Sequence, residues 1–111
     1  MSRSRVRRPG VPFDRLCISC GLPKPVAEFV FAYPRKWRWD WAWPADGVAL
    51  EQHGGIWVHG KHSRGAGQLN DFAKWSEGAA LGWRIIHVVP DHLESSVTFE
   101  LIRQALGVWV R

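Results

Sequence analysis

The chain has 111 residues, of which 46% are hydrophobic and 23% charged, the size and balance of a single globular domain. No apolar run reaches the roughly 18 residues of a membrane span and no signal peptide is visible, which argues against membrane and secreted proteins. The net charge of +5 favours a polyanionic partner, nucleic acid first, although a basic surface that keeps the protein soluble explains it equally well.

Four arginines lie within the first ten positions, MSRSRVRRPG. This stretch carries charge, but no apolar segment follows it. Residues 1–10 are therefore predicted to form a basic flexible arm, and residues 11–111 the folded domain.

Residues 11–21 predict a short helix, with Pro12 near its start and Gly21 at its end. Cys17 and Cys20 form a C-x-x-C within it, but there is no second pair and no histidine at finger spacing, which argues against zinc. The strand-then-helix context of a redox dithiol is also missing. The two cysteines are therefore interpreted as half-buried packing residues.

The next three segments predict strands joined by hairpins. Residues 26–33 alternate and are rich in β-forming residues, and residues 36–43 carry Trp at every second position. Residues 48–53 follow the turn sequence Pro-Ala-Asp-Gly, and the Ile-Trp-Val at 56–58 is expected to continue that strand after two glycines.

The second half predicts a glycine-rich basic loop at 59–67, a helix at 68–81, a covered strand at 83–90 and a helix at 95–107. The side chains expected to face the core are Leu69, Phe72, Trp75, Ala79 and Ala80 on the first helix and Val97, Leu101, Ile102 and Leu106 on the second. Gly78 weakens the first of these helices. The order α-β-β-β-α-β-α predicts an α/β fold with a mixed sheet, in which a helical crossover leads to the fourth strand.

The tryptophan strand and the strand after it form a hairpin with two different faces. If Pro-Ala-Asp-Gly is a four-residue loop, Trp43 pairs with Val48, and Asp40 lies opposite Glu51. The residues expected to share the hydrophobic face are Trp37, Trp39, Trp41, Trp43, Val48 and Leu50. Asp40, Glu51 and His53 are expected on the other face.

Directly opposed side chains have Cβ atoms roughly 4.5–5.5 Å apart, so two carboxylates placed there repel each other. A divalent cation between them would remove the repulsion, and hard oxygen ligands suit Mg²⁺ or Mn²⁺. The alternative is an amphipathic hairpin whose polar face is simply solvated.

Five blocks, RKWRWDWAWP, ALEQHGG, GKHSRG, NDFAKW and GWRIIH, occur in this order between residue 28 and about residue 90. In this arrangement the chain resembles the PD-(D/E)XK nuclease superfamily, and within it small phage and bacterial proteins similar to very-short-patch repair endonucleases and resolvases. The resemblance implies a restriction-endonuclease-like αβββαβ core with a C-terminal helix.

The resemblance also implies site residues. Asp40 and Glu51 would be metal-binding carboxylates for Mg²⁺ or Mn²⁺, with the backbone carbonyl of Gln52 as a further ligand. Glu28 matches a frequent acidic position and would join the site directly or through water. His53 stands where the superfamily has Lys, and would bind the metal, position the attacking water or hold the scissile phosphate.

Lys61 or Lys74 is expected to supply the missing positive charge from elsewhere, and His62 lies in a loop suited to grip phosphate. Asp71 and Lys74 form either an ordinary i,i+3 ion pair or a pair that orients the site. The residues expected to contact DNA are Arg35, Lys36, Arg38, Lys61, Arg64 and Lys74. Trp83 and His87 are assigned to packing, and His59 and His92 to the surface.

The function implied is a metal-dependent DNA endonuclease in the cytoplasm of a bacterial or phage-infected cell, acting in DNA repair or recombination. In-line attack of water would expel the 3′ oxygen and leave a 5′ phosphate. A chain this small suits structure-directed cutting of branched DNA such as a Holliday junction, by a homodimer, or nicking. The alternative is a catalytically inactive member that binds DNA or a protein.

Overall fold

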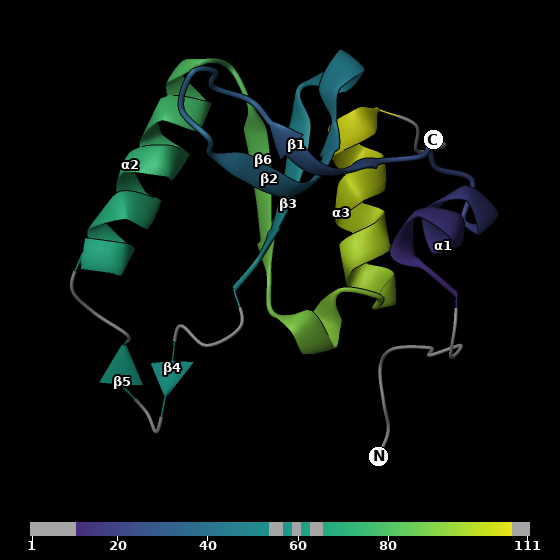
Figure 1. Ribbon diagram of the computed structural model, residues 1–111. Helices are drawn as coiled ribbons and strands as arrows, with labels where there is room; N and C mark the ends of the chain where they lie inside the picture. The colour runs from purple at the N-terminus through teal and green to yellow at the C-terminus, as the bar shows by residue number, and fades with distance from the viewer. Residues whose placement is uncertain (1–10, 54–56, 59–60, 63–65, 108–111) are drawn as a thin grey trace.

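The computed structural model describes residues 11–53, 57–58, 61–62 and 66–107, with only the backbone described for the parts of this range between 57 and 68 (Figure 1). Its centre is a four-stranded mixed sheet in the order β1-β2-β3-β6. The strands are β1 (Val26–Val30), β2 (Arg38–Trp43), β3 (Val48–Gln52) and β6 (Arg84–Val88). β1, β2 and β3 pair antiparallel, and β6 pairs parallel to β3. The predicted α/β fold with a mixed sheet is confirmed.

Three helices cover the two faces of this sheet (Figure 1). α2 (Ala66–Ala80), the crossover between β3 and β6, covers one face, while α1 (Phe13–Ser19) and α3 (Ser96–Leu106) cover the other. The predicted turn forms a 3-10 helix, η1 (Pro44–Asp46), which ends at Gly47 with a left-handed φ of 67°. A second 3-10 helix, η2 (Pro90–His92), links β6 to α3.

The expected continuation of β3 through residues 56–58 is wrong. β4 (Trp57–Val58) instead pairs antiparallel with β5 (Lys61–His62) in a separate two-stranded sheet. Part of the predicted loop at 59–67 is thus the strand β5. A short hairpin pairs backbone hydrogen-bonding groups that a loop would leave to solvent.

The two faces of the sheet have different cores. On the α1 and α3 side, one cluster joins Phe13, Cys17, Trp43, Leu50 and Ile102. Cys17 is fully buried in this cluster and Cys20 packs against it, so both cysteines are packing residues as predicted, with Cys17 more deeply buried than expected. Burial raises the pKa of the Cys17 thiol to about 12.

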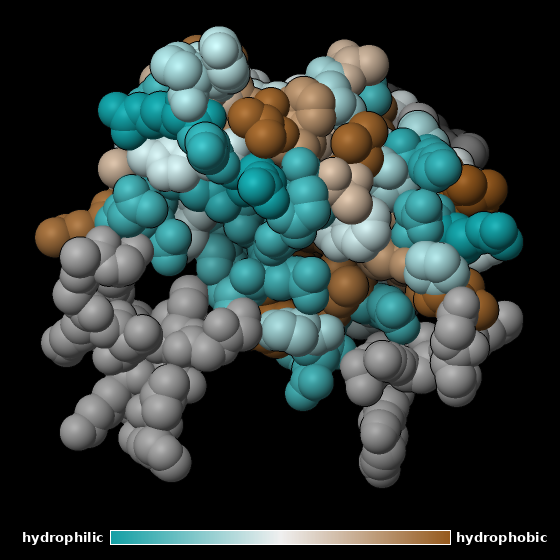
Figure 2. Space-filling view, in the orientation of Figure 1, coloured by the Kyte–Doolittle hydropathy of each residue, from teal (hydrophilic) through white to brown (hydrophobic). Residues whose placement is uncertain are grey.

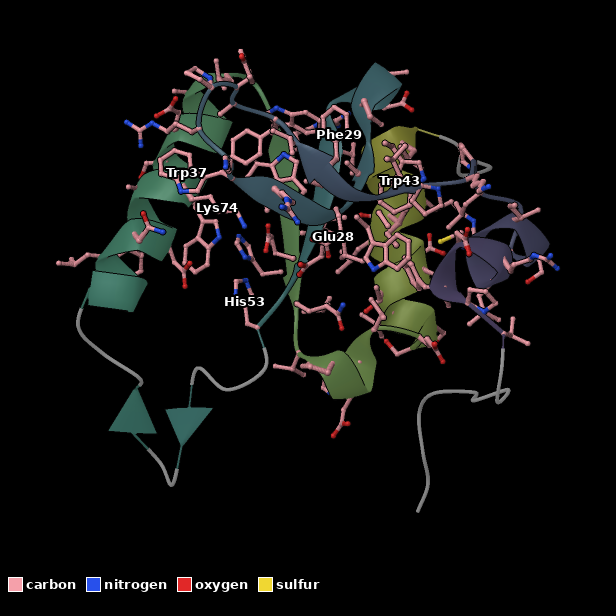
Figure 3. All side chains as sticks on the ribbon, viewed as in Figure 1. Glu28, Phe29, Trp37, Trp43, His53 and Lys74 are labelled. Atoms are coloured by element: carbon pink, nitrogen blue, oxygen red, sulfur yellow. The ribbon has the colours of Figure 1, made fainter. Side chains whose placement is uncertain are left out.

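The second cluster, on the α2 side, shows that the four tryptophans do not share one face. Trp39 is fully buried with Ala42 and Ala49, whereas Trp41 and Trp43 pack in the other cluster. Figure 3 shows the same division, with Trp37 on the α2 side and Trp43 on the α3 side. The strand therefore changes face at Asp40, which is opposite the position where Glu28 has a left-handed φ of 53°.

The space that receives Trp39 is created by small residues. Gly78 of α2 lies directly above it, and a Cβ at this position would be 2.5 Å from Cζ2 of Trp39. Ala42 and Ala49 line the strand side of the same space. The indole turns toward α2 because this volume would otherwise be empty, and an empty cavity is costly.

The core-facing stripe of α2 also differs from the predicted one. Leu69 and Phe72 are 68% and 50% exposed, and Ala79 and Ala80 are exposed as well. The less exposed positions include Asp71, Lys74, Trp75 and Gly78, which follow the i, i+3, i+4, i+7 spacing of one helix face. The inward face is thus partly polar, which hydrophobic periodicity could not indicate.

On α3, Ser95 caps the start by accepting a hydrogen bond from the Thr98 N–H, and Gly107 ends it with a φ of 72°. Ile102 is buried and Leu106 packs against the core as predicted, but Val97 and Leu101 are exposed. Their places are taken by Thr98 and Phe99. Across the described ranges, none of the helices has the length and apolar character needed to cross a membrane.

Candidate active site

The β2–β3 hairpin has the predicted register over three pairs, but the predicted pair of Asp40 with Glu51 is not among them. Trp43 pairs with Val48, Ala42 with Ala49, and Trp41 with Leu50. Past these pairs, the main-chain N–H of Gln52 donates a hydrogen bond to the side chain of Asp40, at 2.8 Å from Oδ2. This hydrogen bond holds the Asp40 carboxylate against the end of β3.

Glu51 is the buried acid of the site. It is 5% exposed, and Nζ of Lys74 lies 2.8 Å from its Oε2. The two groups form a close ion pair, and hydrogen bonding and charge from Lys74 both favour the ionised form of Glu51. Burial raises the pKa of Glu51 to about 7, against the opposing effect of Lys74, and the charges of Asp40 and Asp71 raise it further.

Lys74 therefore brings an ammonium to the site from α2. Its Nζ also lies 5.3 Å from the centre of the Trp39 ring, so the turned indole forms part of its surroundings. Within the described residues Lys74 is ion-paired with Glu51 and not with Asp71, so the predicted i,i+3 pair does not form. Asp71 contributes through its charge, which raises the pKa of both Glu51 and His53.

His53 follows β3 and lies on the α2 side with Lys74 (Figure 3). Its Nε2 is 2.5 Å from Nδ1 of His87, and the two ring planes differ by 24° with centroids 4.7 Å apart, so the rings meet at their edges. Trp75 of α2 presents an edge contact to each of them. Burial lowers the pKa of His53, while Asp71 and Asp40 oppose the shift, and burial also lowers the pKa of His87.

His87 packs against His53 and Trp75, in line with its assignment to packing, but the sequence did not indicate that it would lie next to the predicted site. In the parallel ladder His87 is the register partner of Glu51, which places its side chain on the α2 side with the acids. A register between β3 and β6 would have revealed this, but parallel strands joined by a long crossover leave no local sign of their register. Trp83 packs in the α2-side cluster as predicted, and His92 is exposed as predicted.

The other predicted residues on β1, on β2 and in the connection between them lie at the surface. Glu28 forms an ion pair with Arg38 at 3.4 Å, with both side chains more than half exposed. Arg35 lies 4.3 Å above the ring of Trp37, and Lys36 is exposed. Figure 2 shows hydrophilic side chains gathered over the middle of this face, between α2 and the α3 side. Arg35, Lys36 and Arg38 are thus exposed, and their contact with DNA stays a prediction.

The remaining predicted residues are described incompletely. Lys61 and His62 are in β5, where only the backbone is described, and Arg64 and His59 lie outside the described residues, as does the arm at 1–10. The N–H of Gln52 serves Asp40, and the role of its carbonyl stays a prediction.

The described residues contain no group of three or more His, Cys, Asp or Glu side chains that could hold a metal ion. The predicted ligands are Asp40, Glu51, the carbonyl of Gln52 and, directly or through water, Glu28. Glu28 pairs with Arg38 at the surface, so a third carboxylate does not join the site, and two carboxylates and a backbone carbonyl remain. The chemistry of this set fits a hard divalent cation, since both side chains offer carboxylate oxygens and the charge of Asp40 raises the pKa of the buried Glu51, a repulsion that a cation would relieve.

Comparison with known proteins finds relatives of unknown function. The chain is 34% identical over 80 residues to two uncharacterized proteins of Mycobacterium tuberculosis, one from strain CDC 1551 / Oshkosh and one from strain H37Rv. Each match covers 67% of this chain and 27% of the relative, so the chain spans about a quarter of the length of the curated relatives it matches. No protein-family model matches the chain, and no solved structure matches it at a significant level.

Proposed function

We propose that this protein is a metal-dependent endonuclease of the PD-(D/E)XK type that hydrolyses phosphodiester bonds in DNA. The observation that carries the proposal is the convergence of Asp40, Glu51 and Lys74. Two acids from adjacent strands and one ammonium from the crossover helix meet at one end of a mixed sheet. The fold supports the proposal as well, because its element order is the one that the sequence resemblance implies, apart from the added β4–β5 hairpin between β3 and α2.

Each residue has a role in this reaction. A bound Mg²⁺ or Mn²⁺ would supply Lewis-acid polarisation of the scissile phosphate and activation of the attacking water. Asp40 and Glu51 would hold it, and the N–H of Gln52 fixes the carboxylate of Asp40. Lys74 replaces the lysine that the superfamily has at position 53. Its ammonium lies beside Glu51 and would stabilise negative charge on the phosphate.

The substrate is either branched DNA, such as a four-way junction recognised by its shape, or a duplex in which the enzyme cuts one strand. A described core of this size contains no separate domain for reading a long base sequence. The exposed cations Arg35, Lys36 and Arg38 would contact phosphates, which position the substrate without reading its sequence. Paired cuts at a junction would require a homodimer.

The test is cleavage of supercoiled plasmid and of a four-way junction, with Mg²⁺ or Mn²⁺ and with a chelator. Asp40→Asn and Glu51→Gln should each lower the rate at least about a hundredfold, the effect of removing a group that stabilises the transition state. Asp46→Asn, an exposed acid in the turn of the same hairpin, is the matched control and should cut like wild type. Variants at 40 and 51 that cut at the wild-type rate would refute the proposal.

A catalytically inactive module that binds DNA or a protein is the second candidate. It is favoured by the fact that the acids already have partners within the protein, Gln52 N–H for Asp40 and Lys74 for Glu51. Calorimetric titration with Mn²⁺ separates the two candidates. A nuclease should take up the ion in wild type and lose this uptake in Asp40→Asn, whereas an inactive module should bind DNA with no uptake that depends on Asp40.

A further inference from the structure

His53 is held to β6 at two points. Its main-chain N–H donates to the carbonyl of Val88 at 2.8 Å, and its ring nitrogen Nε2 lies 2.5 Å from Nδ1 of His87. Trp75 closes the third side, with its ring centroid 4.8 Å from that of His53 at an interplanar angle of 89°. A ring with these contacts has little rotational freedom about χ1 and χ2.

The chemistry of the contact restricts the protonation of both rings. A hydrogen bond between two imidazoles needs one N–H donor and one lone-pair acceptor, and a neutral histidine has one of each. If His53 donates from Nε2, both rings carry their proton on Nε2, the more stable tautomer of a neutral histidine.

We propose that His87 is a positioning residue of the active site, which orients His53 by accepting a hydrogen bond from its Nε2–H. This inference rests on the proposed nuclease function. With Nε2 occupied, Nδ1 is the ring nitrogen of His53 that remains for the substrate side, and it is unprotonated. It would accept a hydrogen bond from the attacking water and so direct that water toward the phosphorus.

The position of His87 in the sheet supports this role. It is the register partner of Glu51 across β3 and β6, so the residue that orients His53 is anchored beside the buried acid. The same strand supplies the Val88 carbonyl that binds the His53 backbone. A support built on adjacent sheet residues holds a ring more precisely than a support on a loop.

Substitutions at position 87 test the proposal because they can restore or misplace one atom. His87→Ala should lower kcat about 10- to 100-fold, as the loss of an orienting partner does. Asn places its amide where Nδ1 was, so His87→Asn should recover most of the rate, whereas Gln places its amide near the Nε2 position, so His87→Gln should not. His92→Ala, at an exposed histidine near the end of the same strand, is the matched control and should leave the rate unchanged.

A double-mutant cycle examines whether His87 acts through His53. In a His53→Ala background, His87→Ala should cause no further loss, because its partner is already absent. Additive losses would mean that His87 acts by another route, and the inference would fail.

Nitrogen-15 NMR of the metal-free protein gives a readout that does not depend on cleavage. Nδ1 of His53 should be unprotonated in wild type and should become a mixture of tautomers in His87→Ala. A protonated Nδ1 in wild type, or a His87→Ala enzyme as fast as wild type, overturns the inference and leaves the nuclease proposal standing. A wild-type protein that cuts no DNA in any metal overturns the nuclease proposal itself, so the two failures are distinguishable.

Discussion

At the scale of single residues, the site is defined by charges that are neutralised by neighbours from other elements. Glu51 on β3 faces Lys74 on α2, and Asp40 on β2 accepts from the backbone of Gln52. Burial makes the ionised form of Glu51 costly, and its pKa stays raised even with Lys74 beside it. The stability of the metal-free protein should therefore report the ionisation of Glu51.

Glu51→Gln provides this test. The pKa of Glu51 rises from its ordinary value of 4.5 to about 7 on folding, so the folded state holds a proton that the unfolded state releases. Its contribution to stability is fully present below the unfolded pKa and is lost as the pH rises through the folded pKa. Since one pKa unit is worth about 1.4 kcal/mol, wild type should lose up to about 3 kcal/mol relative to Glu51→Gln between about pH 4 and pH 8.

The measurement is urea unfolding of both proteins at several pH values with a chelator present. The difference between their free energies of unfolding is the quantity of interest, because other titrating groups cancel in it. Two curves that stay parallel over this range would show that Glu51 titrates normally in the folded state.

At the scale of elements, the close approach of α2 to the sheet determines where the ammonium of Lys74 lies. The helix comes near enough only because Gly78 has no side chain, and Trp39 fills the space directly below it. The same approach places Lys74 beside Glu51 and Trp75 beside His53. Packing and site geometry are thus coupled through one helix face.

Gly78→Ala should therefore destabilise the protein, although Ala has the higher helix propensity. The new Cβ would lie 2.5 Å and 2.6 Å from two carbons of the Trp39 ring, so that the helix or the indole must move. Overpacking of this kind costs about 1–3 kcal/mol, somewhat offset by the roughly 1 kcal/mol gained in propensity. Thermal unfolding followed by circular dichroism measures the change.

Ser76→Ala, at an exposed position on the same helix, is the control and should change stability by less than about 0.5 kcal/mol. If Gly78→Ala were more stable than wild type by the full propensity difference, the close approach of helix and indole would be disproved.

At the scale of the whole molecule, the net charge of +5 should act mainly through DNA binding. Affinity that depends on phosphate contacts falls linearly with the logarithm of salt concentration, at about 0.9 per neutralised phosphate. The basic arm at 1–10 contributes four arginines to this charge. The arm lies outside the described residues. Its contribution can be measured through the salt dependence of DNA affinity.

Replacing Arg3, Arg5, Arg7 and Arg8 with Gln should reduce the slope of log K against log salt by roughly 3 to 4, if all four arginines contact phosphates. Fluorescence anisotropy with a labelled junction in Ca²⁺, over a range of salt concentrations, gives this slope without cleavage. Arg15→Gln with Lys24→Gln removes two exposed charges near α1 and is the control. An unchanged slope in the arm variant would mean that the arm makes no phosphate contacts.

The sequence by itself determined the features that depend on neighbouring residues. Turn chemistry at Pro44 to Gly47 and the alternation of the flanking strands predicted the hairpin register, which the structure shows at Trp41 opposite Leu50. The order of helices and strands followed from the same local patterns. These signals are short-range, so one sequence suffices to read them.

Tertiary structure alone decided the features that depend on distant residues. Trp39 lies on the α2 side of the sheet, opposite to Trp41, because the small residues Ala42, Ala49 and Gly78 provide space for its indole there. His87 contacts His53 because β6 pairs parallel to β3, although the helix α2 separates the two strands in the sequence. Which side chains meet across the sheet is set by the volume and register of segments far apart in the chain, and no local periodicity encodes either one.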